Sequence, residues 1–296
     1  MPFPRLFAAT LVVAAFTLAS YAQTGNYTCS QYTYFGPTDI PQGVYSSPGG
    51  IDDSDAVVGQ YEVYQNTYGF VYSRGKFTQY LVPGSRNTVM SGINDAGDIV
   101  GTDTNTVGEN TAAYGFEIIP GKPLVTVSYP GSKDTYATGI NNVGTIVGWY
   151  ELDGASDGFI LSKDGYESIA VSGAFQTEPL GINDSGEVVG TYVLFDNEAF
   201  IYQDGTYTLE TGPAGATYSL FTGVNDKGEI TGYYLNQAQD QLLSFVYIDG
   251  TYYNVTLPGS TNFVVLGSIN NNGDITGYVT YKGGRDTAFL GTGCHY

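Results

Sequence analysis

The amino-acid sequence predicts an all-β protein, a six-bladed β-propeller built from four-stranded antiparallel blades. Three observations support this prediction. One short motif recurs six times, the copies begin about 42 to 47 residues apart, and each copy reads as strands joined by tight turns. A repeat of about 40 to 50 residues with four strands is typical of propeller blades. The clearest copy runs from Gly181 to Tyr192, and the others begin at Gly50, Gly92, Gly139, Gly223 and Ser268.

Each copy contains a four-residue turn, which reads Asn-Asp-x-Gly in three copies and a close variant of it in the other three. Asn or Asp opens such a turn because its side chain accepts a hydrogen bond from the backbone two residues on. Gly186 and its counterparts then take the positive φ that closes a hairpin. In the first copy Asp55 replaces this glycine, and Asp tolerates positive φ better than most residues. The apolar pairs beside the turn, such as Val188-Val189, predict strands buried on both faces.

A small residue followed by Phe comes after every hairpin, as in Gly158-Phe159, and a second tight turn and a final strand follow. Each unit therefore predicts four strands. The chain ends at Tyr296, soon after the sixth such pair, so the last unit lacks its fourth strand. The N-terminal segment from Tyr32 to Pro41 occupies the matching place in the repeat. We predict that this segment completes the last blade, because an unclosed propeller would leave open edges.

Residues 1–22 read as a secretory signal peptide, with one Arg before an apolar run and small residues at Ser20 and Ala22. An uncleaved anchor is the alternative, although the apolar run is short for a membrane span of about 20 residues. Residues 23–296 then form a single propeller domain. We expect a secreted protein, extracellular or periplasmic, whose mature form has no membrane segment.

The two cysteines, Cys29 and Cys294, lie on the two terminal segments that are expected to meet. In a secreted chain this arrangement predicts one disulfide that holds the closure. Two free thiols are the alternative.

The motif Gly-Ile-Asn-Asp-x-Gly-x-Ile/Val-Val-Gly followed by a small residue and Phe resembles the HAF-repeat family of bacterial extracellular proteins. The resemblance covers about Gly50 to Gly291. It implies export and a repeat fold, but no reaction. The chain departs from the family pattern, because no copy has the His of His-Ala-Phe. Any role of that His is therefore absent.

Composition excludes several functions. The formal net charge is −19, which disfavours nucleic acids and anionic membranes as partners. The single His, His295, is next to the C-terminus, so no Ser-His-Asp set or His-rich metal site is expected. We find no catalytic motif, and a role without catalysis is the better prediction. Two carboxylates suffice for a glycosidase, but the sequence does not single out a pair.

The acidic cluster Asp52, Asp53 and Asp55 is the best candidate for a metal site. Calcium is the ion that such oxygen ligands would select, although it needs six to eight oxygens and a tight turn supplies few. The alternative is that these acids only shape the turn. No other cofactor is predicted.

Strand direction places the uniform Asn-Asp turns on one face and the variable loops on the other, where function usually resides. The longest variable loop runs from Asp103 to Ala113. Aromatic residues gather where the second strand of each unit reaches that face. We therefore predict a ligand-binding set: Tyr61, Asp103, Trp149, Tyr150, Tyr192, Tyr234 and Tyr278.

These rings can stack on sugars or anchor a protein partner. Alternatively, they pack between blades, because Tyr is common in strands. Trp149 is the first candidate for an anchor, since Gln60 and Thr102 occupy its position in the preceding copies. We predict a monomeric binding module for a glycan or an extracellular protein, with carbohydrate as the leading ligand. A carbohydrate-active hydrolase or lyase and a structural cell-surface protein are the alternatives.

Overall fold

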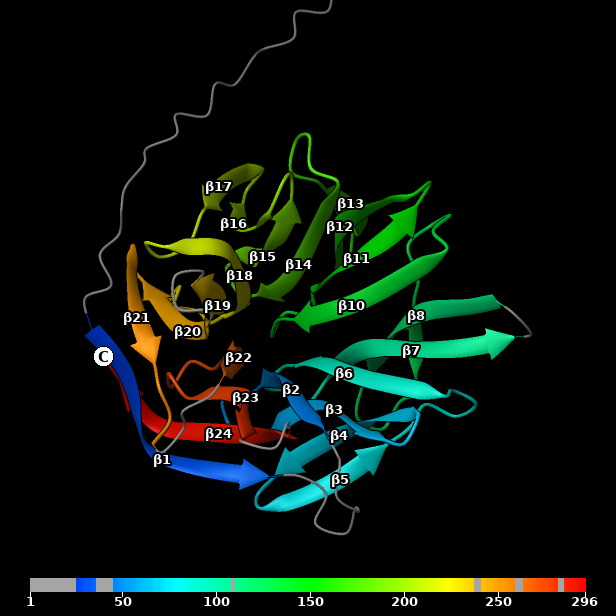
Figure 1. The fold of residues 1–296 in the computed structure, drawn as a ribbon. Helices are drawn as coiled ribbons and strands as arrows, with labels where there is room; N and C mark the ends of the chain where they lie inside the picture. Colours follow the sequence, from blue (N-terminus) through cyan, green and yellow to red (C-terminus); the bar gives the residue numbers. More distant parts are fainter. Residues whose placement is uncertain (1–24, 36–44, 108–109, 237–240, 259–262, 282–284) are drawn as a thin grey trace, which may run out of the picture.

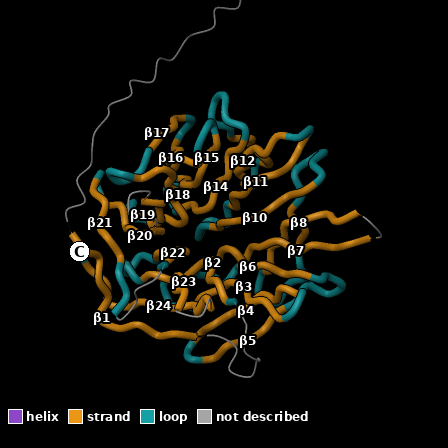
Figure 2. The backbone as a smooth tube through the Cα atoms, in the orientation of Figure 1, coloured by secondary structure: helices purple, strands orange, loops and turns teal. Residues whose placement is uncertain are grey.

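The computed structural model describes residues 25–35, 45–107, 110–236, 241–258, 263–281 and 285–296. Within these ranges the chain forms strands, turns and loops, and no helix (Figure 2). No described helix could therefore cross a membrane. The predicted signal peptide, residues 1–22, and Pro41 lie outside the described residues. The strands belong to three sheets of eight strands each.

The first sheet has the order β18-β19-β20-β21-β1-β24-β23-β22 and joins the two ends of the chain. Its strands are β18 (Ala216–Val224), β19 (Ile230–Asn236), β20 (Gln241–Ile248), β21 (Thr251–Val255), β1 (Gly25–Phe35), β24 (Arg285–His295), β23 (Ile275–Tyr281) and β22 (Val264–Ile269).

The second sheet has the order β10-β11-β12-β14-β15-β16-β17, with β13 paired to β12. Its strands are β10 (Asp134–Ile140), β11 (Ile146–Leu152), β12 (Ala155–Ser162), β13 (Gly165–Ile169), β14 (Gln176–Ile182), β15 (Val188–Val193), β16 (Asn197–Gln203) and β17 (Thr206–Glu210).

The third sheet has the order β2-β3-β4-β6-β7-β8-β9, with β5 paired to β4. Its strands are β2 (Ser46–Ile51), β3 (Val57–Val63), β4 (Asn66–Ser73), β5 (Lys76–Tyr80), β6 (Asn87–Ile93), β7 (Ile99–Val107), β8 (Asn110–Ile118) and β9 (Val125–Val127).

Each sheet consists of two runs of four antiparallel strands that touch through a short parallel contact. In the second sheet, for example, the parallel contact between β12 and β14 is the single pair Ser156 and Gln176. The first strand of each run, namely β2, β6, β10, β14, β18 or β22, lies nearest the middle of the molecule in Figure 1. The later strands lie progressively farther out. The start of every repeated motif therefore faces a common centre.

The N-terminal strand β1 pairs antiparallel with β24, as the sequence predicted for the terminal segments. Cys29 and Cys294 are directly opposite each other in this pairing. They form the predicted disulfide, with an S–S distance of 1.97 Å. β1 also makes a parallel contact with β21, so it lies between two repeats.

The turn prediction is confirmed at the backbone level. Gly186 has a φ of 83°, and the four other glycines at this turn position are also positive. Asp55 takes the same conformation with a φ of 62°. The Asn183 side-chain oxygen accepts hydrogen bonds from the backbone N–H groups of Ser185 and Glu187, at 3.1 and 3.0 Å. This geometry explains why Asn or Asp opens every turn.

The motif has an opening glycine, replaced by Ser268 in the sixth copy, and a closing glycine, and the two positions are crowded for different reasons. A Cβ on the closing glycine Gly190 would lie 2.1 Å from the backbone oxygen of Glu178 in its own unit. A Cβ on the opening glycine Gly181 would lie 3.0 Å from the Cα of Gly223 in the next unit. The close approach between neighbouring units therefore occurs at the opening glycine. A strand irregularity between Pro179 and Gly181 accompanies it.

Candidate functional site

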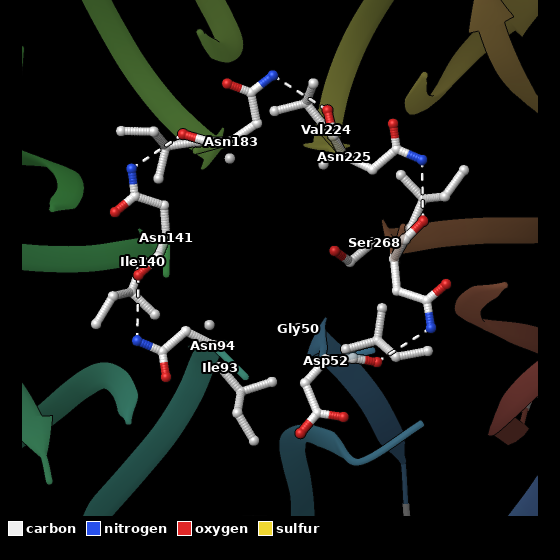
Figure 3. Close-up of a pocket in the computed structure, with 18 of the residues that line it drawn as sticks. Gly50, Asp52, Ile93, Asn94, Ile140, Asn141, Asn183, Val224, Asn225 and Ser268 are labelled. Atoms are coloured by element: carbon white, nitrogen blue, oxygen red, sulfur yellow. Dashed lines mark hydrogen bonds between the residues drawn. The ribbon is translucent and has the colours of Figure 1, made fainter. Parts of the chain in front are cut away.

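The centre of the molecule contains a narrow axial cavity with a volume of about 90 Å³. Its wall is the second half of each innermost strand and the following turn, including Gly139, Ile140 and Asn141 in the third unit. Figure 3 looks along this opening and shows the turn residues arranged around it. Cavities that hold organic ligands commonly measure about 300 to 1,000 Å³. The axial cavity is therefore too small for a sugar ring.

Buried asparagine side chains link five of the six turns to the following turn around the cavity (Figure 3). The Asn141 amide, for example, donates to the backbone oxygen of Asn183 at 2.9 Å. Five such links are formed, by Asn94, Asn141, Asn183, Asn225 and Asn270. The sixth position is Asp52, whose carboxylate cannot donate. The link from the first unit to the second is therefore missing from this inner ring.

A second ring, formed by the next turn residue of each unit, closes completely. The backbone N–H of each of these residues donates to the side-chain oxygen of its counterpart in the following unit, at 2.7 to 2.9 Å. The six members are Asp53, Asp95, Asn142, Asp184, Asp226 and Asn271. The Asn142 amide also donates to both neighbouring carboxylates, and Asn271 does the same. This ring joins the sixth unit to the first.

The three acids predicted as a metal site, Asp52, Asp53 and Asp55, all accept hydrogen bonds at these turns. One Asp52 oxygen accepts three hydrogen bonds within its own turn. Both Asp53 oxygens accept from Asn271, and Asp55 accepts from Asn270. No group of three or more His, Cys, Asp or Glu residues suited to a metal ion occurs within the described ranges. The turn acids therefore serve as hydrogen-bond acceptors between and within units.

A different arrangement lies at the other end of the innermost strands, away from the Asn-Asp turns. We call it the loop-end cluster, and it consists of Tyr136, Trp149, Glu178, Tyr233 and Tyr278. All five side chains are half-buried. They come from β10, β11, β14, β19 and β23, and thus from four consecutive repeats. The Tyr136 and Trp149 rings are stacked, with centroids 3.8 Å apart and an angle of 14° between their planes.

Glu178 holds a central place in this cluster. Burial and then the charges of Asp134 and Glu151 raise the pKa of Tyr136, and Glu178 adds a smaller effect in the same direction. Burial and then Tyr218 and Tyr278 raise the pKa of Tyr233, and Glu178 again adds a smaller effect. The pKa of Tyr233 rises to about 12. Burial also raises the pKa of the Glu178 carboxyl above its ordinary value. The carboxylate thus lies between hydroxyl-bearing rings of the preceding and following repeats.

The structure separates the predicted ligand-binding residues into two groups. Tyr61, Tyr150, Tyr192 and Tyr234 are at most 4% exposed and belong to hydrophobic clusters of the core. These four tyrosines therefore follow the alternative prediction, in which the rings pack in the core rather than contact a ligand. Tyr192, for instance, donates a hydrogen bond to Glu198. Asp103 is 5% exposed, and its carboxylate accepts a hydrogen bond from the Ser85 hydroxyl at 2.5 Å.

Trp149 and Tyr278 are the two predicted residues that reach the loop-end cluster. The predicted ligand-binding set left out their partners Tyr136, Glu178 and Tyr233. A signal for two of them was present, because Tyr136 and Glu178 occupy the same position in successive repeats, three residues before the opening glycine. Other repeats have Ser, Val or Leu there, so a ring and a charge stand out.

No protein-family model matches the chain, and no curated protein sequence matches it. Solved structures do. TolB from Acinetobacter baumannii is 12% identical, with a TM-score of 0.53 over 86% of this chain and 66% of TolB. A mutant Trypanosoma rangeli sialidase displaying trans-sialidase activity is 8% identical, with a TM-score of 0.52 over 92% of this chain and 57% of the sialidase. Both have the β-propeller architecture.

The chain is a β-propeller. Virginiamycin B lyase from Staphylococcus aureus is also similar, at 12% identity over 89% of this chain and 88% of the lyase, with a TM-score of 0.48. These similar structures have different activities, and identities this low show the fold alone. The function of this propeller must be argued from its own residues.

Proposed function

We propose that this chain is a six-bladed β-propeller that is secreted and binds carbohydrate at the loop-end cluster. The observation that carries the proposal is the stacked pair of Tyr136 and Trp149 beside the carboxylate of Glu178. Sugar rings have apolar faces that pack on aromatic rings. They also carry hydroxyl groups that donate hydrogen bonds to a carboxylate. The cluster combines both kinds of contact.

Strand pairing and the turn rings support six blades. Each blade corresponds to one run of four antiparallel strands, and the last run is β22, β23, β24 and β1. The closed ring of turn hydrogen bonds, which returns from Asn271 to Asp53, links the same six units. The parallel contacts that merge neighbouring runs into larger sheets are only one to three residue pairs long. We therefore assign each run to a separate blade.

Export is supported by two features. The Cys29–Cys294 disulfide is typical of an oxidising compartment. The acidic composition suits a soluble exported protein. Membership of the HAF-repeat family, which the motif suggests, would agree with both features and is part of the same proposal.

The asymmetry of the cluster also favours binding at this position. The aromatic residues come from the third, fifth and sixth repeats. In the first and second repeats, the positions equivalent to Tyr136 and Trp149 hold the smaller residues Ser47 with Gln60 and Val89 with Thr102. One side of the axis therefore presents rings, whereas the other presents short side chains. A ligand that stacks on the rings meets less steric hindrance from the opposite side.

The test is a glycan screen with the disulfide-bonded protein, followed by calorimetry on the sugars that bind. Trp149→Ala should weaken binding about thirtyfold, because removing an anchoring ring commonly costs about 2 kcal/mol or more. Tyr64→Ala is the matched control, since Tyr64 is 92% exposed and lies outside the cluster. Its affinity should be unchanged.

Thermal melting of both variants separates a lost contact from a lost fold. A screen in which no glycan binds would contradict the proposal and favour a structural role at the cell surface. Release of reducing sugar from a bound oligosaccharide would instead favour the hydrolase, with Glu178 as the first candidate for its acid. In that case Glu178→Gln should abolish release without preventing binding.

A further inference from the structure

The carboxylate of Glu178 is not a requirement of the repeat architecture. The equivalent positions in the other units are occupied by Ser47, Val89, Tyr136, Leu220 and Val265, of which none is acidic. In every unit this residue pairs across the two innermost strands, as Glu178 does with Thr191. Five units therefore form the same pairing without a carboxylate, and the charge of Glu178 calls for another explanation.

Glu178 also lacks a partner for its charge. Within the described ranges, no hydrogen bond or ion pair reaches its side chain, although it is half-buried. Buried carboxylates are normally paired or hydrogen-bonded, because removing a charge from water is costly. Several other acids follow that rule, such as Glu210, which accepts hydrogen bonds from the hydroxyls of Tyr247 and Tyr252, although the half-buried side chains of Glu117, Glu151 and Asp157 also make no hydrogen bond or ion pair within the described ranges. Among these acids, Glu178 is the one that belongs to the cluster proposed to bind the ligand.

The charged groups around the cluster are predominantly acidic. After burial, the charges of Asp134 and Glu151, which belong to the same repeat, raise the pKa of Tyr136. After burial, the charge of Asp286 raises the pKa of Tyr278. Lys133, a cation beside Asp134, is engaged by the Asp134 carboxylate at 2.9 Å, and its side chain is 73% exposed. The ring faces of Tyr136, Trp149, Tyr233 and Tyr278 add further attraction for a positive charge.

We infer that the loop-end cluster selects sugars that carry a protonated amine, such as glucosamine units, over neutral or acidic sugars. An ammonium group beside Glu178 would supply the missing partner, while the rings contact the sugar face and the adjacent cation. This inference rests on the proposed carbohydrate function and specifies its ligand. A carboxylate-bearing sugar would be repelled by the same charges.

The test compares two ligands that differ at one functional group. Glucosamine oligosaccharides and their N-acetylated counterparts are titrated by calorimetry into the disulfide-bonded protein at near-neutral pH. The wild type should bind the amine form about tenfold more tightly, the effect of one added charged contact. Glu178→Gln should remove this preference. Glu187→Gln is the control, because Glu187 is another half-buried glutamate, placed at the opposite end of its blade next to Asn183.

Equal or tighter binding of the N-acetylated sugar by the wild type would overturn the inferred selectivity and leave the carbohydrate function standing. Binding of neither sugar, nor of any other glycan, would overturn the proposed function itself. A preference that persists in Glu178→Gln would place the cation elsewhere and also overturn the inference. Added salt should weaken the binding of the amine form more than the binding of the N-acetylated form, because salt screens the interaction between the ammonium group and the carboxylate.

Discussion

Ser219 lies six residues after Pro213, and its fully buried hydroxyl has no hydrogen-bond partner. At the same position in three other repeats, a threonine hydroxyl accepts a hydrogen bond from the backbone N–H of the residue six positions earlier. Thr177, for example, accepts a hydrogen bond of 3.0 Å from the N–H of Val171. Proline has no N–H to donate. One substitution in a connecting turn thus leaves a buried polar group unpaired on the innermost strand.

This relationship predicts unequal costs for the same chemical change. Ser219→Ala should leave the free energy of unfolding unchanged or raise it slightly, because only an unpaired hydroxyl is lost. Ser46→Ala at the equivalent position should cost about 1–3 kcal/mol, since the Ser46 hydroxyl accepts the buried N–H of Ala288 at 3.0 Å. Denaturant unfolding of both variants measures the difference. Equal losses would mean that Ser219 has a partner after all.

The missing link in the inner turn ring predicts a stabilising substitution. Asp52→Asn keeps the side-chain oxygen that caps the turn and adds an amide that can donate to the backbone oxygen of Asn94. We expect a gain of about 0.5–1.5 kcal/mol in unfolding free energy. The reverse change, Asn141→Asp, removes an existing donor and should cost about 1–3 kcal/mol. Destabilisation by Asp52→Asn would show that the ring cannot close at this position.

The turns predict a cost that comes from backbone conformation alone. A Cβ on Gly186 meets no atom within 4 Å, so a larger residue there has space but is strained at a φ of 83°. Gly186→Val should lower the unfolding free energy by about 1–3 kcal/mol. Ser185→Ala should have little effect, because Asn183 retains its backbone donors when the Ser185 hydroxyl is lost. Similar denaturation midpoints for the two variants would contradict this assignment.

The glutamates predict how stability depends on pH. Burial raises the pKa of Glu117, Glu178, Glu187 and Glu210 above the ordinary value of 4.5. A raised folded-state pKa contributes stability that is fully present below 4.5 and is lost as pH rises through the folded-state value. The melting temperature should therefore increase as pH falls from neutrality towards 4.5. Reduced repulsion within a chain of net charge −19 acts in the same direction.

Scanning calorimetry across this range measures the pH effect, and Glu178→Gln should make the dependence shallower. A melting temperature that falls steadily as the pH is lowered from neutrality to about 5 would contradict the prediction.

The repeat and the ends of the chain could be interpreted from the sequence because their causes are local or recur. Asn183 and Gly186 form a turn by contacts within a few residues, so their chemistry identifies the hairpin without knowledge of the rest of the fold. Six spaced copies then indicate a propeller. Cys29 and Cys294 were paired correctly because only two cysteines exist and both lie on the terminal segments.

The candidate site could be predicted only in part, because it depends on which face of a strand meets which neighbour. Trp149 and Tyr150 are adjacent, so they point to opposite faces of the blade. Sequence reasoning assigned both to the ligand. In the structure, Tyr150 is 4% exposed in the core, whereas Trp149 stacks on Tyr136 in the loop-end cluster.

The sequence by itself therefore determined the repeat, its turns and the residues available for a disulfide, since spacing and local backbone chemistry express these directly. The tertiary structure alone decided that Glu178 approaches Tyr136 and Tyr233 from neighbouring blades, and that the turn acids become hydrogen-bond acceptors in a closed ring. The contacts of this ring join residues 42 to 47 positions apart or, at the closure, residues from opposite ends of the chain. Their geometry depends on how the blades pack around the axis, which no local pattern specifies.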